Sequence, residues 1–224
     1  MTDPSLIARQ AILKAMLPIA AFDGWTAKSL REAVSKTDLP QGSDDLYFPE
    51  GPLELIGFWA QEMSRRVEND LAELDQSEMK IRDKVTAGVL ARLYAIGPHE
   101  EAARRAVARL SLPDAVGQGP QQVWASADTI WRAIGDTSTD GNYYSKRTIL
   151  AGVITSTLAV WLSDNDPEKV KARDFLDARI ANVMQFEKAK WEFKSKTKNW
   201  PKPGEILGVL RYGGTRKRRR RRRG

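Results

Sequence analysis

The sequence predicts an all-α protein, and three observations lead to this conclusion. Apolar residues recur at three- and four-residue intervals along every long segment, as they do on the buried face of a helix. No segment shows the sustained alternation of apolar and polar residues that is typical of a half-buried strand. The segments are joined by short connections that contain Gly, Pro or Asp. With 224 residues, 42% of them hydrophobic, the chain is long enough for a helical domain with its own core.

Eight or so helices are expected, and residues at their ends support the assignment. Gly24 follows the first periodic segment, Thr26 is suited to cap the second, and Pro52 suits the first turn of a long helix. Asp166 is suited to cap the last long helix, with Pro167 in its first turn. The helical segments cover approximately residues 6–23, 27–34, 44–48, 52–67, 81–96, 99–110, 121–134, 143–162 and 167–184.

Positive charge is concentrated at the C-terminal end. Residues 186–224 contain fifteen Lys and Arg and three Glu, a formal charge of +12, so residues 1–185 carry −5 of the total of +7. Basic residues beside an apolar segment are typical of reversible binding to an anionic membrane surface. A solubilising tail or an RNA-binding tail would have the same composition. The residues assigned to the membrane surface are Trp200, Ile206, Leu207, Leu210, Arg216, Lys217, Arg218, Arg219 and Arg220.

The sequence does not predict an enzyme. It contains no Cys, which excludes disulfides, thiolate metal sites and thiol nucleophiles. His99 is the one histidine and follows Pro98 at an expected helix start, and no Glu-x-x-His pair occurs. A Gly-rich phosphate loop and a nucleophile elbow are also missing. We therefore expect no catalytic residue, metal or cofactor. We also expect no signal peptide and no spanning helix, because no apolar run approaches ~20 residues.

The first part of the chain resembles a known DNA-binding fold. The segments ILKAMLPIAAFDGWTAKSLREAV and GSDDLYFPEGPLELIGFW resemble the N-terminal helix-turn-helix of TetR-type regulators. In that family the helix that ends in Tyr-Phe enters the major groove, and Leu46, Tyr47 and Phe48 are expected to pack inside here. Asp44 and Asp45 are expected to be solvated and would repel phosphates rather than neutralise them. The module is therefore expected not to read DNA, and nucleic acid is not expected as a partner.

The second half of the chain resembles a second family over roughly 60 residues. The segment GDTSTDGNYYSKRTILAGVITSTLAVWLSDNDPEKVKARDFLDARIANVM is similar to the coenzyme Q biosynthesis protein nine family, whose members have a TetR-like fold. The resemblance implies a dimeric, non-enzymatic protein of ubiquinone biosynthesis. It also implies a hydrophobic pocket that holds an isoprenoid or phospholipid, and presentation of quinone intermediates to the demethoxyubiquinone hydroxylase. We expect such a protein in the bacterial cytoplasm, on the inner face of the inner membrane.

Two sets of site residues are expected from this resemblance. The helix bundle is expected to form the pocket, because bundles hold ligands between their helices. Ala151, Gly152 and Thr155 are small enough to leave space beside their helix, or to allow close packing. The expected lipid-binding residues are Trp124, Ile130, Trp131, Leu150, Val153, Ile154, Leu158 and Trp161. These side chains equally fit a closed helical core.

The resemblance also implies a hydroxylase-binding patch. Its expected members are Asp128, Ile130, Asp140, Tyr143, Tyr144 and Arg147. Exposed aromatic residues with an Arg are typical of interface hot spots. Helical projection places Tyr143 on the same side as Leu150, whereas Tyr144 falls off the apolar stripe, so Tyr144 is the first choice for partner contact.

The expected organisation has three parts, and one other function fits the sequence. Residues 1–70 form the TetR-like helix-turn-helix region, residues 71–190 the lipid-binding bundle, and residues 191–224 the basic tail. The alternative function is a TetR-like transcriptional regulator that uses the Arg-rich tail for DNA affinity.

Overall fold

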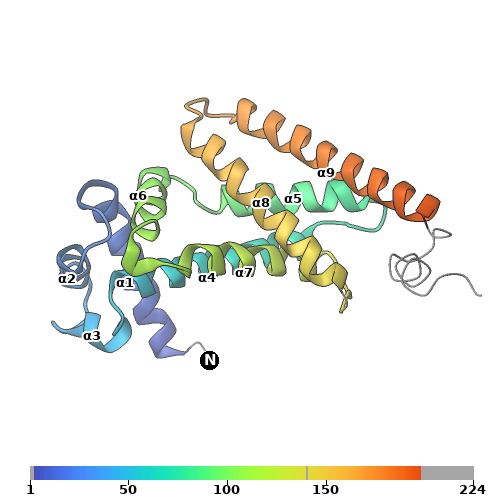
Figure 1. The fold of residues 1–224 in the computed structure, drawn as a ribbon. Helices are drawn as coiled ribbons and strands as arrows, with labels where there is room; N and C mark the ends of the chain where they lie inside the picture. The colour runs from blue at the N-terminus through green and yellow to red at the C-terminus, as the bar shows by residue number, and fades with distance from the viewer. Residues whose placement is uncertain (1–2, 140, 198–224) are drawn as a thin grey trace, which may run out of the picture. The chain divides into compact units, whose positions relative to one another are not determined.

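The computed structural model describes residues 3–139 and 141–197, with side chains as far as residue 185 (Figure 1). Within this part of the chain every regular element is helical, which confirms the all-α prediction. The elements are α1 (Pro4–Asp23), α2 (Ala27–Ser35), α3 (Ser43–Tyr47), α4 (Pro52–Glu73), α5 (Ile81–Tyr94), α6 (Glu100–Leu110), the 3₁₀ turn η1 (Pro113–Ala115), α7 (Gln118–Ala133), α8 (Gly141–Ser163) and α9 (Val170–Thr197).

The chain divides into two units, Met1–Ala181 and Asn182–Gly224, with the boundary inside α9. The architecture described below concerns the first unit. The domain boundary expected after residue 70 lies within α4. Residues 191–197 of the expected basic tail belong to α9, and the rest of the tail, with all nine residues assigned to a membrane surface, lies outside the described residues.

The N-terminal helices form around two buried tryptophans. α1 packs against α2 and α6, and Gly24 ends α1 with a φ of +76°, a conformation that glycine adopts readily. Thr26 caps α2 as predicted, because its side chain accepts a hydrogen bond from Ser29 N at 3.1 Å. Trp25 stacks on Trp59 of α4 with ring centroids 5.5 Å apart. The Trp25 indole also donates to the carbonyl of Ala102 at 2.9 Å, so it joins the α1–α2 turn to α4 and α6.

By length and composition α1 is apolar enough to span a membrane, contrary to the expectation from the sequence, and it is the one such helix in the described part of the chain. A core helix can have the same composition. Its buried residues, among them Ile12, Met16 and Ala20, belong to the surface that packs against α2 and α6. These contacts account for the buried part of its apolar surface, whereas Ile7 and Phe22 are exposed.

Helix α3 differs from its expected packing at two positions. Phe48 is buried, in edge-to-face contact with Phe58 at 5.8 Å, and the Arg9 guanidinium lies over both rings. Leu46, however, is 72% exposed, so the prediction that it packs inside was wrong. Residues two positions apart on a helix point to different sides, and Phe48 takes the inward position here. Asp44 is buried rather than solvated, while Asp45 is exposed.

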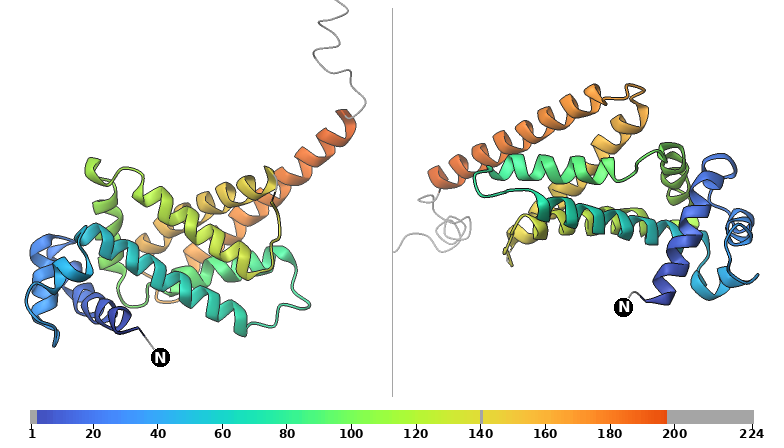
Figure 2. Two further views of the ribbon diagram at one scale, coloured as in Figure 1. Left: turned by 90° about the horizontal axis from the view of Figure 1, so that it is seen from below. Right: turned by 180° about the vertical axis from the view of Figure 1, so that it is seen from behind.

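Helices α4, α5, α7 and α8 form the bundle that contains the candidate site. α4 packs against α5 and α7, and α7 packs against α8; Figure 2 shows α4 and α7 running side by side. α6 contacts α1, α7 and α8, and so closes one end of this group. Between α5 and α7 the packing is close at Gly88, where an added Cβ would lie 2.6 Å from the side chain of Ile130.

The turn between α8 and α9 is held by buried polar groups. Lys169 has a φ of +53°, and its Nζ donates to the carbonyls of Trp161 and Asp164 and to Glu100 at the start of α6. Asp164 accepts a hydrogen bond from Ala172 N at 3.2 Å. Helix α9 begins at Val170, so the prediction that Asp166 and Pro167 start it was wrong. Asp164, two residues earlier, provides the carboxylate at this helix start.

Candidate functional site: an apolar pocket between five helices

A pocket of about 850 Å³ lies between α4, α5, α6, α7 and α8, all of which belong to the first unit. Its size lies within the range of roughly 300–1,000 Å³ that is typical of small-molecule sites. Trp59 and Met63 of α4, Val107 and Leu110 of α6, and Leu158 of α8 are among its apolar walls. None of the described residues that line it is an acid, a lysine or a histidine. The pocket is therefore suited to an apolar chain.

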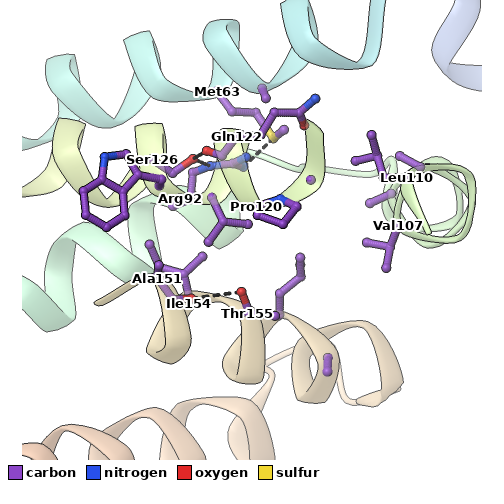
Figure 3. A pocket seen from close by; sticks show the side chains of 18 of the residues that line it. Met63, Arg92, Val107, Leu110, Pro120, Gln122, Ser126, Ala151, Ile154 and Thr155 are labelled. Atoms are coloured by element: carbon purple, nitrogen blue, oxygen red, sulfur yellow. Dashed lines mark hydrogen bonds between the residues drawn. The ribbon is translucent and has the colours of Figure 1, made fainter. Parts of the chain in front are cut away.

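Small residues explain why the helices leave space here. Ala103 and Ala106 face the pocket from α6, and Ala151, Gly152 and Thr155 face it from α8 (Figure 3 labels Ala151 and Thr155). A Cβ added at Gly152 would meet no heavy atom within 4 Å, in contrast to the tight contact at Gly88. The three small residues of α8 that the sequence singled out thus mark the open side of that helix rather than a close helix contact.

The structure brings together three of the eight residues expected to bind lipid. Trp124, Ile154 and Leu158 line the pocket. The other five do not: Ile130 packs on Gly88, Leu150 and Val153 are buried, Trp161 packs edge-to-face on Tyr94, and Trp131 donates its indole N–H to the carbonyl of Lys146. An apolar stripe identifies the inward side of a helix, but it does not show which part of that side meets a neighbour and which meets a space.

Sequence reasoning missed the contributions of α4, α5 and α6. The most unusual of these is Arg92 of α5, whose Nε donates to Ser126 Oγ at 3.2 Å and whose Nη1 lies 2.8 Å from the sulfur of Met63 (Figure 3). Burial lowers the pKa of Arg92 to about 10, so the side chain stays charged at neutral pH. The alanine-rich pattern of α6, with Ala102, Ala103 and Ala106 inward, was the one visible signal that this helix offers little bulk.

The residues expected to bind the hydroxylase form two different environments. Arg147 is 1% exposed and forms ion pairs with Asp128 at 2.6 Å and Asp136 at 3.2 Å. Its guanidinium lies 3.5 Å from the ring centroid of Tyr143, and the Tyr143 hydroxyl donates to Asp128. This cluster joins α7 to α8. Ile130 is fully buried, and Asp140 lies outside the described residues.

The charges in this cluster stabilise one another. Burial alone would raise the pKa of Asp136, but hydrogen bonds from Lys146, Ser138 and Arg147 outweigh it and lower the pKa to about 2. For Arg147, burial opposes the charge, and the hydrogen bonds with Asp128 and Asp136 outweigh it, so its pKa is raised. Both groups are therefore ionised across the physiological range, as a structural ion-pair network requires.

Tyr144 is the member of this set that reaches the surface. It is 65% exposed, and its ring lies 6.3 Å from that of Trp124, a residue of the pocket wall, and 5.1 Å from that of Tyr143. The projection that separated Tyr143 from Tyr144 thus agrees with their burial, since Tyr143 is half-buried. An exposed aromatic residue beside the pocket wall is suited to contact a partner.

Comparisons with known proteins match the part of the chain that contains α7 and α8, the helices that carry most of the expected site residues. Residues 116–187 match the COQ9 family model. This span includes α7, α8 and the first part of α9, and the resemblance noted in the sequence is thereby confirmed. The ubiquinone biosynthesis protein COQ9, mitochondrial, of Bos taurus is 29% identical over 190 residues, which is 82% of this chain and 60% of the relative. The COQ9-A protein of Xenopus laevis is 30% identical over 187 residues, 79% of this chain and 57% of the relative. The chain thus spans about 60% of the length of these curated relatives.

The fold itself has a solved counterpart. A TetR transcriptional regulator from Nitrosomonas europaea superposes with a TM-score of 0.65 at 16% identity, covering 79% of this chain and 98% of the regulator. The TetR-like fold is therefore confirmed. At this identity the likeness concerns the fold alone.

Proposed function

We propose that this protein is a lipid-binding accessory protein of ubiquinone biosynthesis. The observation that carries the proposal is the apolar pocket of about 850 Å³, two of whose walls, α7 and α8, lie in the span that matches the COQ9 family. Burying an apolar chain in such a pocket is favourable by about 0.8 kcal/mol for each methylene removed from water. An isoprenoid chain attached to a quinone ring is the natural ligand class for a protein with relatives of this name.

The composition of the pocket supports binding rather than catalysis. Its described lining contains no Asp, Glu, His, Lys, Cys or Tyr, the side chains that most often transfer protons or attack substrates. The one charged residue of that described lining, Arg92, stays protonated near neutral pH because its pKa is about 10. We propose that chemistry on the bound lipid is performed by a partner enzyme, the demethoxyubiquinone hydroxylase.

The exposed side chain of Tyr144 supports a docking surface for that partner. Tyr144 lies beside Trp124, so a partner that binds at Tyr144 would contact this protein next to the pocket. A homodimer and a membrane-surface location complete the proposal. The location rests on the sequence of the basic tail: clustered Lys and Arg are attracted to anionic lipid by about 1 kcal/mol each.

Two measurements test the proposed function. Native mass spectrometry of the purified full-length chain is expected to show a bound quinone, isoprenoid or phospholipid that organic solvent releases. Deletion of the gene is expected to cause the demethoxy intermediate of ubiquinone to accumulate, and re-expression of the chain should reverse this. A ligand-free protein together with normal ubiquinone levels in the deletion strain would refute the proposal.

A further inference from the structure

Arg92 is the charged member of the described pocket lining, and it has an unusual set of partners. Among the described residues its guanidinium contacts the hydroxyl of Ser126 and the sulfur of Met63, and both groups are neutral. A thioether is a weak acceptor, and Ser126 Oγ itself donates to the carbonyl of Gln122. A guanidinium has five N–H donors, so these contacts use only part of its capacity.

Other partly or fully buried arginines of the described chain differ from Arg92 in one respect. Arg147 has two carboxylate partners and Arg9 has Glu54 at 2.8 Å. No described carboxylate forms an ion pair with Arg92, and burial is the cause that lowers its pKa. The Arg92 side chain is partly accessible and lines the pocket. The other described residues that line the pocket are uncharged. A desolvated cation without a counter-ion is unfavourable, and an anion brought by a ligand would offset that cost.

We propose that Arg92 binds the acidic oxygens of an amphiphile, a carboxylate or a phosphate, whose apolar chain occupies the rest of the pocket. The inference rests on the proposed lipid-binding function and adds the chemical class of the polar end. Arginine is suited to this role because its planar fork matches carboxylate and phosphate groups with two parallel hydrogen bonds. Ser126 positions the guanidinium through the Nε contact and leaves Nη2 available for the ligand.

The position of Arg92 also sets the direction of the ligand. Figure 3 shows Arg92 beside Ser126 and Met63, while Val107 and Leu110 of α6 lie on the other side of Pro120. The acidic end is placed against α5 and α7, and the chain extends toward the apolar residues of α6. Met63, although apolar, lies at the acidic end, because its thioether lies against the guanidinium of Arg92.

The test compares two probes that differ only at the polar end, hexadecanoate and hexadecanol. Their binding to the full-length chain is measured by displacement of a bound fluorescent apolar dye, with inorganic phosphate as a third competitor. The variants are Arg92→Met, which removes the charge, Arg92→Lys, which keeps it, and Arg82→Met as a control for an exposed arginine on the same helix. Circular dichroism melting of each variant shows that it is folded.

We expect the wild-type chain to bind hexadecanoate about tenfold or more tightly than hexadecanol, as a charge-assisted contact implies. Arg92→Met should abolish this preference while it leaves hexadecanol binding within about twofold. Arg92→Lys should keep part of the preference, and Arg82→Met all of it. Inorganic phosphate should not compete, because it lacks the chain.

Each other outcome has a defined meaning. Equal binding of the two probes by the wild-type chain, or a preference that survives in Arg92→Met, overturns the role of Arg92 but leaves the lipid pocket in place. Loss of hexadecanol binding in a folded Arg92→Met overturns it too, since the residue would then shape the pocket rather than select the head group. Competition by inorganic phosphate would indicate a site for free anions and would overturn the proposal that the ligand is an amphiphile. If neither probe binds the wild-type chain, the proposed function fails with the inference.

Discussion

Substitution of Gly152 is expected to change ligand binding and protein stability in opposite directions. Gly152 lies within α8 and lines the pocket, and a Cβ at this position meets no heavy atom within 4 Å. Glycine inside a helix is about 0.8–1.0 kcal/mol less favourable than alanine, and leucine is close to alanine. Gly152→Leu is therefore expected to stabilise the protein by about 0.5–1 kcal/mol, which raises Tm by about 1–4 °C in a chain of this size.

The same substitution is expected to weaken ligand binding. The introduced leucine side chain would occupy space otherwise available to about three or four methylene groups of a ligand chain. At about 0.8 kcal/mol for each, the loss is about 2–3 kcal/mol, or roughly 30- to 150-fold in affinity. Gly152→Ala is the matched control, because it gains the same helical stability but adds only one methyl group.

The assay combines thermal unfolding with quantitative native mass spectrometry of lipid that co-purifies. The reasoning requires that Gly152→Leu melt at a higher temperature than wild type with little bound lipid, and that Gly152→Ala melt equally high with its lipid retained. A leucine variant that is destabilised would mean that the space beside α8 is filled by protein. One that keeps its full lipid content would mean that the ligand lies elsewhere.

Further predictions concern α8 and the tail. Tyr144→Asp should weaken binding of the purified hydroxylase in a pull-down without a change in Tm beyond about 1 °C, because the side chain is 65% exposed; a large fall in Tm would place it in the core. Arg147→Met should cost about 2–3 kcal/mol in denaturant unfolding, since Asp128 and Asp136 lose their shared buried partner and keep only the more exposed Arg132 and Lys146; a cost below about 1 kcal/mol would contradict that. Because the pKa of Asp136 is lowered from 3.8 to about 2, its contribution of about 2 kcal/mol is complete above pH ~4 and is lost as pH falls toward 2. Asp136→Asn should flatten that part of the acid unfolding curve, and an unchanged curve would show that other acids dominate it. Deletion of residues 216–224 should remove salt-dependent attraction to DNA; sequence-specific binding that survives the deletion would favour a regulator.

Much of the fold could be predicted because its signals are local. Gly24 and Thr26 mark helix ends through a positive φ and a side-chain cap, and both signals depend on a few neighbouring residues. The long helix α8 was expected at 143–162 and is observed at Gly141–Ser163, because it is a long, mainly apolar segment between two polar loops. Leu46 and the start of α9 were misplaced, since both depend on which of two nearby candidates takes the buried position.

The pocket could be predicted only in part, because a cavity is a property of several helices at once. Leu150 and Leu158 look alike in sequence, yet Leu150 is 2% exposed in the core while Leu158 lines the pocket. Gly152 predicted the position of the pocket better than the apolar residues did, because the space beside α8 depends on small side chains rather than on apolar ones. Nothing in the sequence indicated a role for Arg92, and only the contacts with Met63 of α4 and Ser126 of α7 show that it is desolvated.

The polar attachments of α8 lie near its two ends, and its middle carries both pocket-lining residues and the buried residues Leu150 and Val153. Toward its start, Arg147 is fixed to Asp128 and Asp136; at its finish, the Leu162 carbonyl accepts from Arg104 and the Trp161 carbonyl accepts from Lys169. Both ends of α8 are thereby fixed to neighbouring elements, and Tyr144, close to the first of these attachments, lies beside Trp124 of the pocket wall. We therefore expect Tyr144 to keep the same position whether the pocket is empty or filled.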